Sequence, residues 1–197
     1  ISAILFGGRR ARTVPLVYQS FDWAHGVFLG ATMASETTAA QTGAVGVLRR
    51  DPMAMLPFCG YNMADYWGHW LKVGRQASKP PAIFQVNWFR TDENGRFIWP
   101  GFGENLRVLR WVREQVSGRS DGRETPIGIL PTADALGARE VGLSEHAVDT
   151  LLAVDRGEWV HEVEDQAAWL DKFGDRLPKE IRAQHTALLN RLSPVTA

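Results

Sequence analysis

An apolar run at residues 82–89, AIFQVNWF, constrains the fold more than any other stretch of this chain. It is the strongest strand pattern in the sequence, and it leads directly into a turn. Asp92 and Gly95 occupy the first and fourth positions of a type I turn, and a left-handed Gly95 makes this a three-residue hairpin loop with a bulge. The sequence therefore predicts a hairpin in which Thr91 lies opposite Phe97.

Aromatic rings crowd around this turn. Residues 85–105 contain three glycines and five aromatic residues, which are Trp88, Phe89, Phe97, Trp99 and Phe102. The hairpin register puts Phe89, Phe97 and Trp99 on one face, and the flanking glycines let Phe102 approach closely. Two facing rings can hold a planar group such as a nucleobase, and Asn105 offers a donor and an acceptor for its edge. The alternative, which the pattern alone favours, is that the rings fill a core.

Apolar runs at 2–6, 13–18 and 26–33 give the first half of the chain the character of strands and turns. Pro15 makes the second of these runs an edge or irregular strand. With the run at 82–89, they predict a sheet.

Helical patterns begin at Asn62 and dominate from Asn105 onward. Asn62 and Ser144 are suited to cap helices, and Pro178 suits the first position of the last helix. In the helix that starts at Asn105, the spacing predicts an inner face that includes Leu109.

Composition excludes several classes of protein. Lys+Arg and Asp+Glu are both 22, so the charge gives no reason to expect nucleic acid or an acidic membrane surface. No apolar run approaches the roughly 20 residues of a membrane span. None of the five histidines pairs with Cys, Asp or Glu at metal-ligand spacing. A single cysteine fits a reducing compartment, and we expect a cytoplasmic protein without a nucleic-acid or membrane partner.

Two further segments allow a functional and a plain interpretation. FGGRRARTVP (6–15) places arginines on a glycine turn after a buried strand, which can hold phosphate or carboxylate, or can be a solvated basic turn. It does not match G-x-x-x-x-G-K-[ST]. The stretch 34–46 has no large side chain, which suits a mobile lid or an ordinary surface loop.

Several motifs follow one another in a fixed order that resembles the carboxy-terminal third of the GTP-dependent phosphoenolpyruvate carboxykinases. They are FGGRR, SETTAA, DPMAMLPFCGYN, VNWFR, GRFIWPGFGEN and TPIG, and the likeness runs from about residue 3 to the end. The resemblance implies conversion of oxaloacetate and GTP to phosphoenolpyruvate, carbon dioxide and GDP. It also implies two divalent cations, typically Mn²⁺ and Mg²⁺.

The resemblance assigns a guanine site to the aromatic segment. It implies that Phe89 and Phe102 sandwich the base, that Phe97 closes its edge, and that Trp88 lines the same pocket. Asn105 would contact the base edge. The resemblance therefore favours a binding site for a planar base over the alternative that the rings fill a core.

The resemblance also assigns roles to the two glycine- and alanine-rich segments. Arg9 would reach the transferred phosphoryl group. A mobile lid would comprise Glu36, Thr37, Thr38, Ala39, Ala40, Gln41, Thr42 and Gly43. The sequence departs from the family at Ala11, where many members have proline, and at Gln41 and Thr42, where many carry an acid.

The fold that this resemblance implies is α/β: a mixed sheet with flanking helices, forming the C-terminal part of a larger nucleotide-binding domain. We expect a strand-rich guanine-pocket and lid region at 1–128 and a helical region at 129–197. The family's phosphate loop, metal ligands and oxaloacetate-binding arginine would all lie upstream. We therefore expect a fragment that is inactive alone, has the N-terminal part of the same enzyme as its partner, and belongs to a monomer. The alternatives are a non-catalytic nucleotide- or sugar-binding module, and a carboxykinase that uses pyrophosphate.

Overall fold

A computed structural model describes residues 1–38 and 46–193. Five strands form one sheet in the order β1-β5-β2-β7-β6, in which β1 and β5 are parallel and the other neighbours are antiparallel. The strands are β1 (Ala3–Gly7), β2 (Val17–Gln19), β5 (Ala82–Val86), β6 (Arg123–Thr125) and β7 (Gly128–Leu130). A separate antiparallel pair consists of β3 (Ala34–Glu36) and β4 (Leu48–Arg50). The predicted mixed sheet is confirmed.

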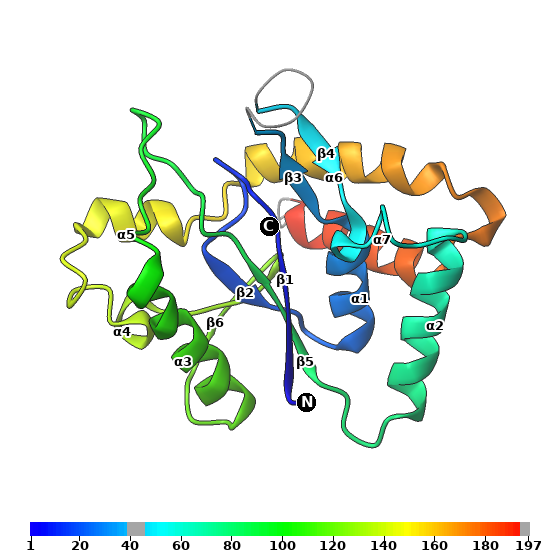
Figure 1. The fold of residues 1–197 in the computed structure, drawn as a ribbon, viewed down its shortest axis with the longest axis horizontal. Coiled ribbons are helices and arrows are strands. Elements are labelled where there is room, and N and C mark those ends of the chain that lie inside the picture. The colour runs from blue at the N-terminus through cyan, green and yellow to red at the C-terminus, as the bar shows by residue number, and fades with distance from the viewer. Residues whose placement is uncertain (39–45, 194–197) are drawn as a thin grey trace.

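Helices cover both sides of this sheet. In Figure 1, α1, α2, α6 and α7 lie on one side of β1 and β5, and α3, α4 and α5 lie on the other. The helices are α1 (Trp23–Thr32), α2 (Met63–Gln76), α3 (Asn105–Val116), α4 (Ala133–Leu136), α5 (Glu145–Leu151), α6 (Arg156–Asp171) and α7 (Lys179–Leu192). Short 3-10 turns are η1 (Pro52–Ala54), η2 (Phe102–Glu104) and η3 (Gly174–Arg176). The chain is thus α/β and helical toward its C-terminus. None of the helices in the described ranges is long and apolar enough to cross a membrane.

The predicted helix caps are present. The Asn62 side chain accepts a hydrogen bond from the backbone N–H of Ala64 at the start of α2, and the Ser144 hydroxyl accepts one from Ala147 at the start of α5. Each cap satisfies an N–H group that the first helical turn leaves without a partner. Pro178, predicted at the first position of the last helix, instead precedes it as the N-cap, and α7 begins at Lys179.

The strand character expected for 26–33 was wrong, because residues 26–32 lie in α1 and Met33 is its C-cap. Asp22 starts that helix by accepting a hydrogen bond from the His25 N–H at 2.7 Å. A Cβ atom on Gly26 would lie only 2.5 Å from the Ile83 side chain, so glycine is needed for α1 to pack this closely on β5. A helix buried on all sides shows no polar face, and its sequence reads like a buried strand.

The predicted inner face of α3 was wrong at Leu109. Leu109 is 43% exposed, and Val108 and Trp111 are the residues that are fully buried. Trp111 packs edge-to-face on Phe84 of β5, with ring centroids 5.7 Å apart. The large indole therefore sets the rotation of the helix and turns Leu109 outward.

Candidate nucleotide-binding site

The turn after β1 is fastened to β3 along its backbone. A Cβ atom on Gly8 would lie 2.4 Å from the carbonyl oxygen of Ala34, so only glycine allows the two segments to approach this closely. The Arg9 N–H donates to the Ser35 hydroxyl at 3.1 Å, and the Arg9 carbonyl accepts from the Glu36 N–H at 2.8 Å. The backbone from which Arg9 projects is therefore fixed.

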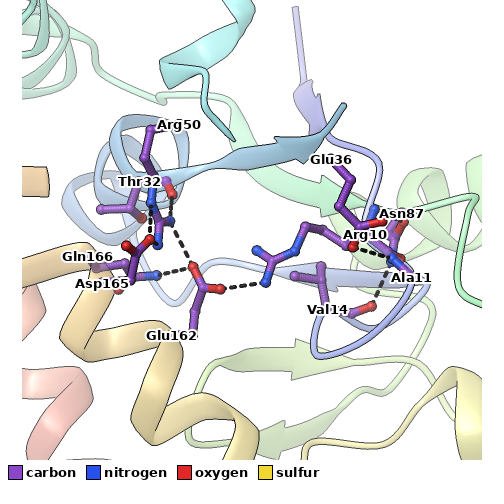
Figure 2. Close-up of polar contacts among 10 residues, drawn as sticks. All are labelled: Arg10, Ala11, Val14, Thr32, Glu36, Arg50, Asn87, Glu162, Asp165 and Gln166. Atoms are coloured by element: carbon purple, nitrogen blue, oxygen red, sulfur yellow. Dashed lines mark hydrogen bonds and ion pairs between the residues drawn. The ribbon is translucent and has the colours of Figure 1, made fainter. Parts of the chain in front are cut away.

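The side chain of Asn87 binds the backbone of Arg10, the next residue of this turn. Its Oδ1 accepts from the Arg10 N–H at 3.2 Å, and its Nδ2 donates to the carbonyls of Arg10 and Val14, each at 2.8 Å (Figure 2). Asn87 is completely buried. Sequence reasoning missed this role, although a polar residue inside the apolar run 82–89 was the available signal.

Ala11 uses a backbone group that proline lacks. Its N–H donates to Glu36 Oε1 at 2.9 Å (Figure 2). A proline at this position has no N–H and cannot form this bond. Alanine at this position thus allows an additional connection between the arginine turn and β3.

The bulged hairpin has the predicted register. Thr91 pairs with Phe97, and the Asp92 N–H donates to the Arg96 carbonyl at 2.9 Å. Gly95 has a positive φ of 75°, and its N–H donates to the Asp92 carbonyl at 3.1 Å. The Asp92 side chain also accepts from the Arg96 N–H at 2.8 Å, which closes the loop as an Asx-type turn does.

Arg9 and the hairpin meet at the ring of Phe89. The Arg9 guanidinium carbon lies 3.9 Å from the centroid of this ring, which is a cation–π contact. Phe97 meets Phe89 edge-to-face, with centroids 5.7 Å apart. Phe97 is 58% exposed, so its ring belongs to an accessible surface and not to the core.

Two hollows share Arg9 and Phe89. One measures about 350 Å³, and its other lining residues include Gly8, Ser35 and Trp88. The second measures about 260 Å³, and its lining includes Glu36, Thr91 and Phe97. Their volumes are close to the lower end of the range for small-molecule sites. The site therefore offers a cation stacked on an aromatic ring, next to open space.

The end of the aromatic segment divides into a buried and an exposed part. Trp99 is only 2% exposed and belongs to the core, as the plain interpretation of the rings required. Its indole N–H donates to Asn105 Oδ1 at 2.9 Å. Phe102 is 95% exposed and has a positive φ of 48°, directly after Gly101. Among the described ring contacts, Phe89 pairs with Phe97 and not with Phe102.

Three of the predicted lid residues lie within the described chain. The Thr37 N–H donates to the Val47 carbonyl at 2.9 Å, and the Thr37 carbonyl accepts from the Gly46 N–H at 3.0 Å. Glu36 and Thr38 line the smaller hollow. The other predicted lid residues, at 39–43, lie outside the described residues.

Metal ligands are not gathered in the described ranges. Across 1–38 and 46–193, no group of three or more His, Cys, Asp or Glu side chains is placed to hold a metal ion. These residues therefore do not by themselves fit the two-metal chemistry that the resemblance implies.

The fold and site define an α/β domain that presents an arginine turn and an aromatic hairpin at the ends of β1 and β5. A family model described as the phosphoenolpyruvate carboxykinase C-terminal P-loop domain matches residues 1–191. The chain belongs to this family.

Named relatives agree with this assignment. The chain is 50% identical over 192 residues to a "Phosphoenolpyruvate carboxykinase [GTP]" of Anaeromyxobacter dehalogenans strain 2CP-1. It is 51% identical over 195 residues to the protein of that name from Arthrobacter sp. strain FB24, and 51% identical over 193 residues to that of Chlamydia muridarum. In each case the match covers 98% of this chain and 32% of the relative. The chain therefore spans about a third of the length of the curated relatives that it matches.

Proposed function

We propose that this chain is the C-terminal portion of a GTP-dependent phosphoenolpyruvate carboxykinase. The complete enzyme converts oxaloacetate and GTP to phosphoenolpyruvate, carbon dioxide and GDP. The names of the relatives support the reaction, and the site supports the part that this chain plays in it. That part is to hold the nucleotide and to bring an arginine to its transferred phosphoryl group.

The juxtaposition of Arg9 and Phe89 carries this proposal. A nucleotide requires a flat apolar surface for its base and a cation for its phosphates. Phe89 and Arg9 supply them at one site, where the guanidinium carbon lies over the ring, 3.9 Å from its centroid. Guanine stacks on the ring of Phe89, with Phe97 at its edge and Trp88 beside it. Phe102 closes over the base from the exposed side. Arg9 leaves the ring and contacts the phosphoryl group.

Chemically, the reaction divides into a decarboxylation that leaves an enolate and a phosphoryl transfer to that enolate. Arg9 stabilises the negative charge on the transferred phosphoryl oxygens. The aromatic site orients GTP and excludes water, which would otherwise intercept the phosphoryl group. In the complete enzyme, Mn²⁺ and Mg²⁺ would be held by residues outside this chain. The roles proposed for Arg9 and the aromatic site do not require these residues to bind a metal.

Further aspects of the proposal concern the whole protein. Glu36, Thr37 and Thr38 belong to a lid over the nucleotide, and the chain divides into a pocket region at 1–128 and a helical region at 129–197. The complete enzyme is a cytoplasmic monomer in which the N-terminal part supplies the phosphate loop and the oxaloacetate site.

The test is an assay of the full-length protein with oxaloacetate and GTP, with pyrophosphate as the alternative phosphoryl donor. Arg9→Gln should lower kcat by about 10²–10³-fold, the usual effect of removing one group that stabilises transition-state charge. Arg12→Gln is the matched control, because Arg12 is exposed in the same turn. Activity with pyrophosphate in place of GTP, or equal activity of the two variants, would contradict the proposal.

A further inference from the structure

One buried carboxylate joins two arginines that come from distant parts of the sequence. Glu162, in the middle of α6, contacts Arg10 Nη2 through Oε2 at 2.5 Å and Arg50 Nη1 through Oε1 at 2.7 Å (Figure 2). The side chains of Glu162, Arg10 and Arg50 are only 5%, 9% and 8% exposed. The turn after β1, the end of β4 and helix α6 thus meet at a single residue.

The other contacts of this cluster are less central. Arg50 also donates to the Thr32 carbonyl at 2.5 Å and pairs with Asp165, whose side chain is 57% exposed. The Gln166 amide lies 3.5 Å from Glu162 Oε1. Asp165 is therefore a surface carboxylate that pairs with Arg50 alone, whereas Glu162 is a buried carboxylate that pairs with both Arg10 and Arg50.

Geometry is the main contribution that such a cluster can make. A buried ion pair often adds no stability over apolar residues of the same shape, but it fixes the positions of its partners, and removing one charge leaves the others buried without compensation. Glu162 holds two guanidinium groups, each with a rigid fork of donors. A small change in this carboxylate therefore displaces both arginines.

Arg10 and Arg50 are each connected to Arg9 through covalent or hydrogen bonds of the backbone. Arg10 is its direct neighbour, held by Asn87 at the main chain and by Glu162 at the side chain. Arg50 pairs with Ala34 in the β3–β4 register, and the next two residues of β3 bind the Arg9 backbone. Glu162 thus supports the position of Arg9 by two separate routes.

We propose that Glu162 is a positioning residue for the nucleotide site: by holding Arg10 and Arg50 together, it sets the direction in which Arg9 projects toward the phosphoryl group. This inference rests on the proposed function of the chain. It assigns to helix α6 a role in phosphoryl transfer without contact with the nucleotide.

The test uses the full-length protein and two probes. The affinity for guanosine, which has no phosphates, measures binding at the aromatic site. The kcat with GTP depends in addition on the position of Arg9. Glu162→Gln keeps the shape of the side chain and removes its charge. It should lower kcat by about ten- to a hundredfold, as small misplacements of catalytic groups do. Guanosine affinity should stay within about twofold, because Glu162 contacts Arg10, Arg50 and Gln166, none of which belongs to the aromatic site.

Asp165→Asn is the matched control, since it removes a carboxylate from the same cluster at the surface, and its kcat should stay near the wild-type value. If Glu162→Gln does not fold, Glu162→Asp decides the question, because it keeps the charge and shortens the reach. A reduced kcat with unchanged guanosine affinity in that variant supports the proposal. An unchanged kcat in a folded Glu162 variant overturns it. A wild-type protein that binds neither guanosine nor GTP would instead refute the function on which the proposal rests.

Discussion

The indole N–H of Trp99 donates a hydrogen bond to the side-chain oxygen of Asn105 at 2.9 Å. An indole N–H can only donate, so the amide oxygen must face Trp99, and the amide nitrogen is left to face away from it. Trp99 is buried and cannot readily turn. Asn105 is therefore presented as a hydrogen-bond donor, which suits the O6 and N7 acceptors of guanine better than the amino group of adenine.

Asn105→Asp should test this orientation. The aspartate keeps an oxygen for Trp99, but it presents a second acceptor where the amide donated. We expect guanosine binding by the full-length protein to weaken by about 1–3 kcal/mol, the scale of a lost base-edge contact. Calorimetric titration measures this. Asn94→Asp makes the same change at the exposed tip of the hairpin and should leave binding unaltered. Equal affinities for both variants would argue against contact between Asn105 and the base.

Phe102→Ala should affect binding and not stability. The ring is 95% exposed, so its removal takes little from the core. If it stacks on the base, affinity for guanosine nucleotides should fall by about 1–3 kcal/mol while Tm is unchanged. Phe58 is also exposed, at 76%, and Phe58→Ala is the control. A loss of affinity common to both variants would show that the effect is not stacking by Phe102.

Gly8→Ala should disturb the arginine turn. The new Cβ would lie 2.4 Å from the Ala34 carbonyl oxygen, so β3 and the turn must separate. We expect a loss of stability of about 1–3 kcal/mol, typical of overpacking, together with reduced GTP-dependent activity. In Gly68→Ala, the nearest atom to the new Cβ is 3.9 Å away, inside helix α2. That control should gain roughly 0.5–1 kcal/mol in helix propensity. Chemical denaturation of the full-length variants distinguishes these outcomes.

His25 should make the fold sensitive to acid. Its Nδ1 accepts from the Phe21 N–H at 3.0 Å, and burial, with a smaller effect from Arg191, lowers its pKa to about 3. The unfolded state, with a pKa of about 6.5, binds the proton more readily. The stability that His25 contributes is therefore complete above pH 6.5 and is lost as the pH falls toward 3.

Unfolding of the full-length protein between pH 7 and pH 4 checks this expectation. His25→Asn keeps an acceptor for Phe21 and should flatten the dependence of the unfolding free energy on pH. His69→Asn, at an exposed position in α2, should not change that dependence. An identical pH profile for wild type and His25→Asn would show that other groups control acid stability.

Local features of the fold could be predicted from the sequence. The caps at Asn62 and Ser144 and the bulged turn at Gly95 depend on side chains within a few residues of the backbone groups that they satisfy. Patterns of apolar residues were less informative where a helix is buried on all sides, or where one large aromatic side chain sets the rotation of a helix. For this reason α1 resembled a strand, and the inner face of α3 was misplaced at Leu109.

Most of the polar support of the site could not be predicted, because its partners are far apart in the sequence. Asn87 lies 77 positions from Arg10, and Glu162 lies 152 positions from it. Glu164, Asp165 and Asp171 in the same helix are exposed, and the type of residue alone does not separate Glu162 from them. Only the tertiary structure shows that this carboxylate is turned inward.

The distance between Arg10 and Glu162 along the chain also bears on biosynthesis. The arginine turn leaves the ribosome 152 residues before the carboxylate that neutralises it, which corresponds to about 8–30 s of translation. During that interval Arg10 and Arg50 lack their shared counter-ion, and burying them would be unfavourable. The part of the chain that precedes α6 should therefore remain open until the helix emerges. Nascent chains stopped before residue 162 should be cleaved by protease near the arginine turn, and chains that extend past α7 should be protected there.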